Sequence, residues 1–146
     1  MSKRKKYYVA YGSNLNRAQM AVRCTAAQIA GTSVLEGWRL QFRGERNYVV
    51  ATVEPCKGAS VPVLVWEITP ADEAALDRYE GFPVLYRKDT VTVPLNGKPV
   101  RAMIYVMNEG RPPGEPSAYY YSTILEGYND SFFDSQTLLK AVLDSK

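Results

Sequence analysis

The chain contains no histidine. This absence excludes serine–histidine and cysteine–histidine nucleophile pairs, and it excludes metal sites that depend on histidine ligands. Only two cysteines are present, Cys24 and Cys56, and they lie too far apart in the sequence to form a Cys-x-x-Cys motif. Two cysteines alone cannot complete a zinc site, so we expect no bound metal. We expect both to be free thiols, although their spacing leaves a single disulfide open.

The chain also has little net charge. The 146 residues carry 18 Lys and Arg against 15 Asp and Glu, a formal net charge of +3. Four of the positive charges are the consecutive residues 3–6, and the charges of the remaining chain nearly cancel. A nearly neutral body argues against binding of nucleic acid, which requires a basic face on the folded domain. We therefore expect residues 1–6 to be a basic, flexible tail and residues 7–146 to be a single domain.

Long hydrophobic runs are absent as well. No segment approaches the length that crosses a membrane, and the charged start of the chain lacks the apolar stretch of a secretory signal. We expect a soluble, cytoplasmic protein without a membrane partner. Hydrophobic residues make up 46% of the chain and charged residues 23%, as is typical of a globular protein. A chain of this length can bury a core without metal or disulfide support.

Hydrophobic periodicity and turn signals predict an α+β chain. The dipeptide Asn96-Gly97 is typical of a two-residue hairpin turn, and Thr69 with Pro70 marks the start of a helix that Gly81 ends. Strands are predicted over residues 7–11, 34–43, 48–53, 61–68, 88–95 and 99–107, and helices over residues 16–24, 72–79, 117–127 and 135–143. This irregular order predicts a small mixed β-barrel or sheet flanked by a few helices.

A candidate binding loop, Gly12-Ser13-Asn14, follows the first predicted strand. Backbone N–H groups at the start of a helix are unpaired, and they can bind a carboxylate, a phosphate or a developing oxyanion. Gly12 would let a ligand approach the backbone closely. The loop lacks the glycine spacing and the lysine of a phosphate-binding loop. The pattern leaves open an ordinary turn in which Ser13 or Asn14 caps the helix.

A candidate general acid/base lies near the end of the predicted helix 72–79. Leu76, Tyr79 and Glu80 are three and four residues apart, so they share a helix face, which should turn inward. Burial and the helix C-terminus would both raise the pKa of the Glu80 carboxylate toward neutrality, where general acid/base catalysis is efficient. The alternative is an exposed glutamate ahead of a capping glycine. Asp77, at the same turn, is expected to face solvent.

Tyrosines give a weaker signal. The chain has 11 of them, and Tyr119, Tyr120 and Tyr121 are consecutive, so one or two of these three must face inward. Tyr120, Ile124 and Gly127 lie on one helix face. Most tyrosines simply pack with the hydroxyl group at the surface, so a role in lining a pocket needs further support.

Together these segments resemble the gamma-glutamylcyclotransferase family over residues 8–127. The residues that carry the resemblance are Tyr8-Val9-Ala10-Tyr11-Gly12-Ser13-Asn14, the segment 51–55, the strand 63–68, then Leu76-Asp77, Glu80-Gly81 and Tyr86, and finally Pro116-Ser117 with Tyr120, Ile124 and Gly127. Their order along the chain makes the resemblance specific. The family's small mixed β-barrel with flanking helices agrees with the fold predicted above.

The resemblance implies roles for individual residues. Glu80 matches the family's essential carboxylate, the general acid/base. The implied substrate-binding residues are Tyr8, Val9, Ala10, Tyr11, Gly12, Ser13, Asn14 and Tyr120, most of them acting through the backbone, and Tyr86 and Tyr105 match positions near the pocket. The implied reaction is an intramolecular acyl transfer in which the glutamyl α-amine attacks its own γ-carbonyl. It releases 5-oxoproline and an amine or amino acid, and it needs no cofactor or metal.

The leaving group of that reaction stays open. Residues 80–83 with Tyr86-Arg87 look like the branch that acts on gamma-glutamyl amines, whereas residues 11–14 look more like the branch that acts on peptides. Residues 128–133 depart from the better-known members. An amino acid, an amine or a gamma-glutamyl-protected biosynthetic intermediate is compatible with these motifs. The alternative function is a non-catalytic module that binds a small carboxylate, and in either case we expect a monomer or a homodimer.

Overall fold

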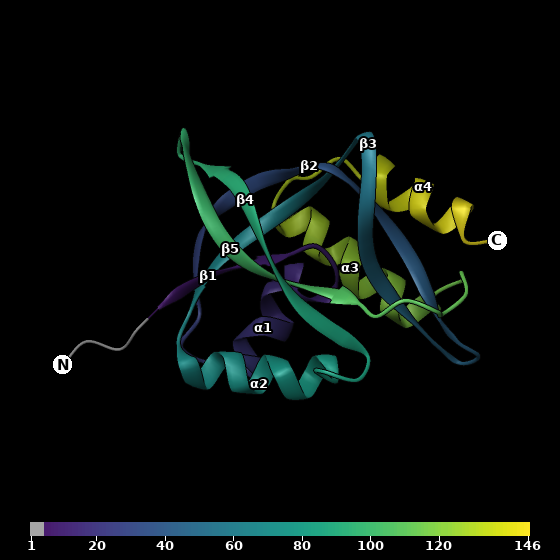
Figure 1. Ribbon diagram of the computed structural model, residues 1–146, viewed down its shortest axis with the longest axis horizontal. Coiled ribbons are helices and arrows are strands. Elements are labelled where there is room, and N and C mark those ends of the chain that lie inside the picture. The colour runs from purple at the N-terminus through teal and green to yellow at the C-terminus, as the bar shows by residue number, and fades with distance from the viewer. Residues whose placement is uncertain (1–4) are drawn as a thin grey trace.

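Five strands form one mixed sheet in the order β2-β3-β1-β5-β4 (Figure 1). The computed structural model describes residues 5–146, and residues 1–4, on which most of the predicted tail falls, lie outside the described residues. The elements in chain order are β1 (Lys6–Ala10), η1 (Ser13–Leu15), α1 (Arg17–Arg23), β2 (Gln28–Glu45), β3 (Tyr48–Ile68), α2 (Pro70–Glu80), β4 (Tyr86–Leu95), β5 (Lys98–Met107), α3 (Ala118–Asp130) and α4 (Gln136–Asp144).

The central strand β1 joins the two halves of the sheet. It runs antiparallel to β3 and parallel to β5, while β2 pairs with β3 and β4 pairs with β5 as antiparallel hairpins. The two edge strands then meet, because Ser33 on β2 donates a hydrogen bond to the Pro94 carbonyl on β4. A Cβ atom on Gly31 would lie 3.0 Å from Leu95 Cδ1, so glycine permits this close approach. The sheet thereby closes into a small barrel.

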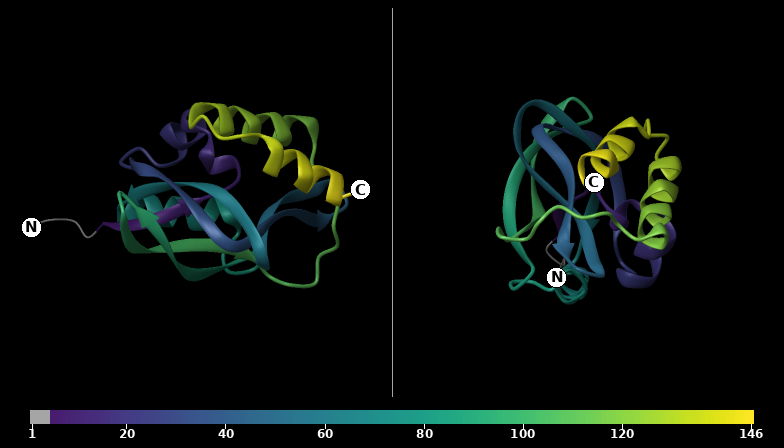
Figure 2. Two further views of the ribbon diagram at one scale, coloured as in Figure 1. Left: turned by 90° about the horizontal axis from the view of Figure 1, so that it is seen from above. Right: turned by 90° about the vertical axis from the view of Figure 1, so that its right-hand side faces the viewer.

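The helices pack on the barrel and share its core. Helices α3 and α4 lie side by side along one face of the sheet, and α2 crosses the barrel at a different side (Figure 2). Strand β3 is buried on both faces over residues 63–65, and the helices contribute the fully buried side chains of Leu76, Ile124 and Leu138. This packing brings the ends of β1, α2 and α3 to the same region of the molecule.

The structure confirms the predicted α+β fold and the hairpin. Asn96 and Gly97 have φ angles of 53° and 80°, as a type I′ turn requires. Two predicted strands, 48–53 and 61–68, belong to one element, β3, because Glu54, Pro55 and Ser60 still pair with β2, on either side of residues 56–59, which have no partner in the ladder at the register shift between Glu36 and Trp38. Strand β2 begins at Gln28, before the predicted residue 34, and the predicted helix 16–24 is shorter and follows the separate turn η1.

The predicted boundary of the tail at residue 6 is wrong. Lys6 is the first residue of β1 and lies opposite Ile68 in the ladder with β3. Its ammonium group also lies 2.9 Å from a carboxylate oxygen of Glu73 on α2. The sheet therefore begins one residue earlier than the hydrophobic pattern indicates, since the long lysine side chain reaches an acidic partner from the end of the strand.

Both cysteines are free, as expected, and burial raises the pKa of the Cys24 thiol to about 11. Within residues 5–146, no helix is long and apolar enough to cross a membrane.

Candidate active site

A narrow pocket lies where the loop after β1, strand β3 and helices α2 and α3 meet. We call it the Glu80 pocket, and its lining residues are Tyr8, Tyr11, Gly12, Ser13, Asn14, Ala51, Glu80, Tyr86, Tyr105 and Tyr120. Its free volume is about 20 Å³, which is room for roughly one water molecule. It brings together nine of the eleven residues that the sequence or the resemblance singles out. A ligand larger than water must displace side chains to enter.

Helix α2 presents Glu80 to this pocket. The helix starts with a capping box, in which Thr69 and Asp72 bond each other's backbone N–H groups, and Pro70 occupies the first turn. It ends at Gly81, whose φ of 71° suits glycine. Leu76 is fully buried, so it fixes which side of the helix faces inward. Glu80 follows four residues later on the same face.

The Glu80 carboxylate lies in an environment that favours its neutral form. Burial raises the pKa of Glu80 to about 7, and the positive charge of Arg23 opposes this rise. Within residues 5–146, no Lys or Arg forms an ion pair with Glu80. A carboxyl group that titrates near neutrality can both accept and donate a proton at physiological pH. The alternative of a fully exposed glutamate does not describe this side chain.

The side-chain amide of Asn14 has a fixed orientation between Arg23 and Glu80. Arg23 Nη1 donates to Asn14 Oδ1, and a guanidinium group can only donate, so the oxygen of the amide must face Arg23. The amide nitrogen therefore faces the pocket. It donates to the Tyr8 hydroxyl at 2.8 Å and lies 3.4 Å from Glu80 Oε2. Arg23 thus positions a hydrogen-bond donor beside the Glu80 carboxylate.

The candidate loop is not an ordinary capping turn. The residue that caps α1 is Asn16, whose side chain accepts a hydrogen bond from Gln19 N, and neither Ser13 nor Asn14 takes this role. No side chain caps the start of η1 at Gly12. Trp66 Nε1 donates to the Asn14 carbonyl at 3.1 Å and holds the loop in place. The side chains of Ser13 and Asn14 are consequently free to line the pocket.

Two tyrosine hydroxyls bond the backbone of Ala51 in opposite senses. Tyr86 donates to the Ala51 carbonyl, whereas the Ala51 N–H donates to the Tyr120 hydroxyl at 3.0 Å. The Tyr120 proton is therefore free for an acceptor in the pocket, and so is the proton of Tyr8, which accepts from Asn14. Burial raises the pKa of both Tyr8 and Tyr120, so these hydroxyls stay protonated and can donate.

Two other tyrosines of the pocket use their hydroxyl groups structurally. Tyr11 donates to the Tyr105 carbonyl at 2.7 Å, and Tyr105 donates to Asp77 Oδ1 at 2.6 Å. Asp77 also accepts from Lys88 Nζ at 3.0 Å. The expectation that Asp77 faces solvent is therefore wrong, because β4 and β5 bring two donors to it.

Two predicted substrate-binding residues do not line the pocket. Val9 and Ala10 are fully buried in the core, since their side chains belong to the middle of the sheet. Sequence reasoning missed Arg23 and did not assign Ala51 to the site. Ala51 lies in the segment 51–55 that carries part of the resemblance, whereas Arg23, which bonds Asn14 from α1, belongs to no local pattern that could have indicated it.

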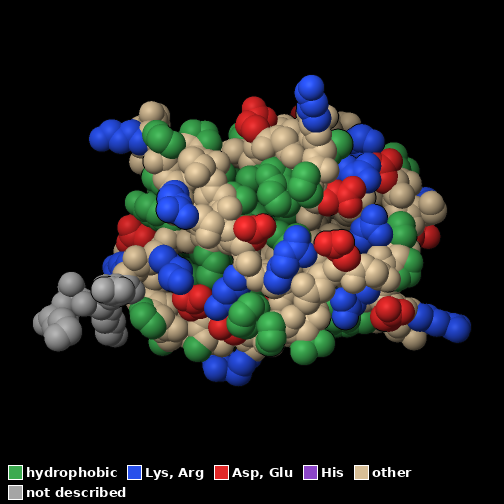
Figure 3. All heavy atoms as spheres, viewed as in Figure 1, with side chains coloured by type: hydrophobic (Ala, Val, Ile, Leu, Met, Phe, Trp, Pro, Cys, Tyr) green, Lys and Arg blue, Asp and Glu red, His purple; other side chains and the backbone are tan. Residues whose placement is uncertain are grey.

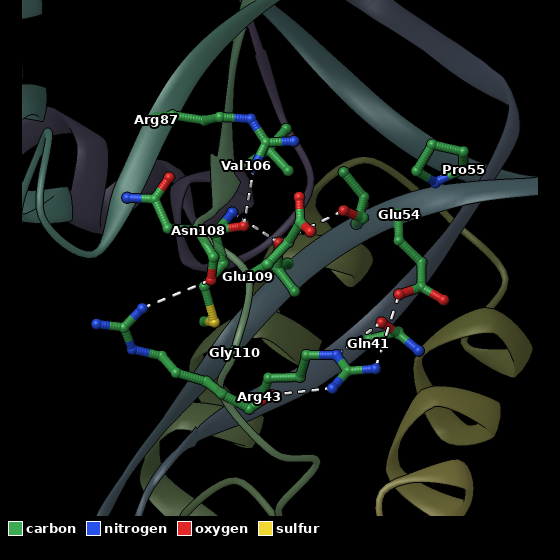
Figure 4. Close-up of a pocket in the computed structure, with 13 residues that line it drawn as sticks. Gln41, Arg43, Glu54, Pro55, Arg87, Val106, Asn108, Glu109 and Gly110 are labelled. Carbon is green, nitrogen blue, oxygen red and sulfur yellow. Dashed lines mark hydrogen bonds and ion pairs between the residues drawn. The ribbon is translucent and has the colours of Figure 1, made fainter.

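A larger cavity of about 420 Å³ is lined by residues of β2, β3, β4 and β5 and of the segment 108–111 that follows β5 (Figure 4). Arg43, Arg87 and Arg111 line it, and each donates to a backbone carbonyl, at 2.9 Å, 3.3 Å and 3.5 Å respectively. Glu54 lines it as well and pairs with Arg43 at 3.7 Å. None of the predicted site residues borders this cavity, so the candidate active site is the smaller Glu80 pocket.

The family model described as gamma-glutamyl cyclotransferase, AIG2-like, matches residues 8–123. The chain belongs to this family. The matched range contains every residue of the Glu80 pocket. No curated protein sequence shows a significant match to the chain.

Solved structures share the architecture of this chain. One, described as a gamma-glutamyl cyclotransferase, is 26% identical with a TM-score of 0.82, covering 95% of this chain and 88% of that one. An uncharacterized human protein, loc79017, is also 26% identical, with a TM-score of 0.81, and the alignment covers 94% of this chain and 88% of that one. A yeast gamma-glutamyl cyclotransferase specific to glutathione is 12% identical with a TM-score of 0.65, over 99% and 96% of the two chains, and shows the fold alone. Family and neighbours together support gamma-glutamyl cyclotransferase activity in general.

Proposed function

We propose that the protein converts gamma-glutamyl compounds into 5-oxoproline and a free amine or amino acid, with Glu80 as the general acid/base. The observation that carries this proposal is the Glu80 carboxyl group, whose pKa burial raises to about 7 beside the Gly12–Asn14 loop. A site that only binds an anionic ligand gains nothing from a carboxylate in its wall, so the non-catalytic alternative is not favoured.

In the proposed reaction, the substrate supplies its own nucleophile. The glutamyl α-nitrogen forms a bond to the γ-carbon, and the bond between the γ-carbon and the leaving nitrogen breaks. Two protons leave the α-ammonium group and two reach the departing amine, so protons balance without a cofactor. Glu80 takes a proton from the α-nitrogen and passes it to the leaving nitrogen, and Glu80 ends in the state in which it began. Such a proton shuttle contributes roughly 10²- to 10⁴-fold in rate.

The rest of the pocket would orient the glutamyl chain. The free protons of Tyr8 and Tyr120 suit the oxygens of a carboxylate or carbonyl, and Asn14 places a further donor beside Glu80. Backbone N–H groups at Gly12 and Ser13 can stabilise the oxyanion that forms on the γ-carbonyl. Holding the amine against its own carbonyl is worth on the order of 7–11 kcal/mol of the barrier.

The deciding experiment measures release of 5-oxoproline from gamma-glutamyl amino acids, gamma-glutamyl-ε-lysine and gamma-glutamyl amines. Glu80→Gln keeps the size of the side chain and should reduce kcat by about 10²-fold or more while the protein still binds substrate. For the wild type, kcat/KM should fall as the pH drops below about 7, since Glu80 is then protonated. EDTA should leave the rate unchanged. Equal turnover by Glu80→Gln would contradict the proposed role.

We expect no nucleic-acid partner for this function. On the face shown in Figure 3, Lys and Arg side chains alternate with Asp and Glu side chains and form no continuous basic surface. This distribution supports the proposal of a small-molecule substrate.

A further inference from the structure

Arg23 is a partly buried cation without an acidic partner. Its Nη1 donates to Asn14 Oδ1 and its Nη2 donates to Gln19 Oε1 at 2.8 Å. Within the described part of the chain, no Asp or Glu oxygen lies within 4.0 Å of its guanidinium group. A guanidinium has five N–H donors, so most of its capacity is unused. A partly buried guanidinium group without an acidic partner favours the binding of an anionic ligand.

Arg23 lines a second cavity next to the Glu80 pocket. We call this the α1 cavity, and it has a volume of about 340 Å³ lined by Ala18, Gln19, Val22, Arg23 and Tyr79. Its walls are largely apolar, since they consist of two aliphatic side chains, the aliphatic parts of Gln19 and Arg23, and the ring of Tyr79. Val22 is 84% exposed, so the cavity opens to solvent. A small amino acid or amine fits a space of this size.

Arg23 and Tyr79, which line the α1 cavity, also contact residues of the Glu80 pocket. The Tyr79 ring lies under the Arg23 guanidinium, 3.5 Å from Cζ to the ring centroid, and the Tyr79 hydroxyl bonds Ser13 Oγ at 2.8 Å. Ser13 and Asn14, which these two side chains contact, belong to the Glu80 pocket.

The size of the Glu80 pocket requires such a second space. Its free volume of about 20 Å³ does not accommodate a glutamyl group together with the group beyond the scissile bond. That group must therefore lie outside the pocket. The α1 cavity is adjacent, because its lining residues Arg23 and Tyr79 contact Asn14 and Ser13 of the pocket.

We infer that the α1 cavity is the leaving-group subsite and that Arg23 binds the free α-carboxylate of an amino acid leaving group with a small or apolar side chain. This inference rests on the proposed function and names its substrate class. A guanidinium group recognises a carboxylate through paired, charge-assisted hydrogen bonds, which an amine without a carboxylate cannot form. The subsite therefore selects gamma-glutamyl amino acids over gamma-glutamyl amines.

The test compares two substrates that differ only in this charge, gamma-glutamyl-alanine and gamma-glutamyl-alaninamide. The wild type should prefer the acid by about tenfold or more in kcat/KM. Arg23→Gln should reduce this preference to near unity, and Arg23→Lys should keep part of it. Loss of Arg23 also affects Asn14 and Glu80, which lowers the rates on both substrates. The ratio between the two substrates is therefore the readout that isolates carboxylate recognition.

Two further variants distinguish a loss of carboxylate recognition from a general loss of activity. Arg17→Gln removes the same charge from the same helix at an exposed position outside both cavities, so the preference should not change. Val22→Asp adds a carboxylate at the exposed rim of the α1 cavity, and it should lower kcat/KM several-fold more for the acid than for the amide. Because Val22 is exposed, this variant does not disturb the core.

Three outcomes overturn the inference. Equal kcat/KM of the wild type for both substrates, with 5-oxoproline released from each, leaves the proposed function standing and removes the carboxylate subsite. A preference that survives in Arg23→Gln assigns carboxylate recognition to another residue. No release from either substrate overturns this inference alone if gamma-glutamyl-ε-lysine or a gamma-glutamyl amine still releases 5-oxoproline, and it overturns the proposed function as well if no substrate does.

Discussion

At the scale of single residues, hydrogen-bond direction separates tyrosines that hold the site together from tyrosines that can bind a ligand. The hydroxyl groups of Tyr86 and Tyr120 both bond the backbone of Ala51. Only Tyr120 acts as the acceptor in its bond, and so only Tyr120 has a proton left for a substrate oxygen. The two residues have the same chemistry and a common partner, which makes them a matched pair for mutation.

Tyr120→Phe should therefore raise KM for a gamma-glutamyl substrate by about three- to tenfold, because one hydrogen bond to the substrate is lost. Tyr86→Phe should change KM much less. Each variant leaves one backbone group of Ala51 unpaired, so both should lower the free energy of unfolding by about 1–3 kcal/mol. Steady-state kinetics and urea unfolding measure the two effects. Equal rises of KM in the two variants would contradict the separate role of Tyr120.

The sequence alone predicts part of this site. Glu80 is predictable because it follows Leu76 by four residues on one helix face, and Gly12 is predictable because a strand ends at it. The role of Arg23 is not predictable, since it depends on contacts with Asn14 and Tyr79, which belong to other elements. Local periodicity indicates which way a side chain faces, but it does not reveal which distant side chain it meets there.

At the scale of elements, helix α3 sets the position of the binding loop. A Cβ atom on Gly127 would lie 2.6 Å from Leu15 Cβ and 2.7 Å from Asn16 N, so helix and loop touch without room for a side chain. Asn16 Nδ2 also donates to the Thr123 carbonyl of α3 at 3.0 Å. The helix that carries Tyr120 is in this way fixed against the loop that carries Asn14.

Gly127→Ala should push α3 away from η1 and distort the pocket from outside it. Overpacking of this kind costs about 1–3 kcal/mol of stability, and we expect kcat/KM to fall as well, although Gly127 contacts no substrate. Glu126→Ala, at the exposed neighbouring position, is the control, and it should leave both quantities nearly unchanged. Thermal unfolding and 5-oxoproline release measure the outcome. An active, fully stable Gly127→Ala would show that the close contact is dispensable.

Elements with strong local signals are the ones that the sequence predicts correctly. The Thr69 cap, Pro70 and the left-handed Gly81 define α2 within two residues, and Asn96-Gly97 defines the hairpin. The long strand β3 is predicted as two pieces, because Pro55 and Gly58 normally interrupt a strand. Pairing of Pro55 and Ser60 with β2 holds the two ends of that segment in one strand, and this pairing is a tertiary effect that no local pattern carries.

At the scale of the whole molecule, the barrel must tolerate an ionised carboxylate that it buries. Burial raises the pKa of Glu80 from the usual 4.5 to about 7, whereas the unfolded chain titrates at the usual value. Between these two pH values, the folded protein holds a proton that the unfolded chain has released. The contribution of Glu80 to stability is therefore largest below about pH 4.5, falls as the pH rises to about 7, and is constant above it. The proposed active site thus costs stability at the pH at which it works.

Glu80→Gln should remove this cost, because glutamine does not ionise. The free energy of unfolding of Glu80→Gln relative to the wild type should rise by about 1–3 kcal/mol between pH 5 and pH 8. Glu73→Gln is the control, since its ion pairs with Lys88 and Lys6 outweigh the effect of burial and lower the pKa of Glu73. The stability that Glu73 contributes is complete above about pH 5, so that variant should be destabilised equally at both pH values. Urea unfolding at the two pH values measures both differences, and a pH-independent difference for Glu80→Gln would mean that Glu80 is not a buried, ionising group.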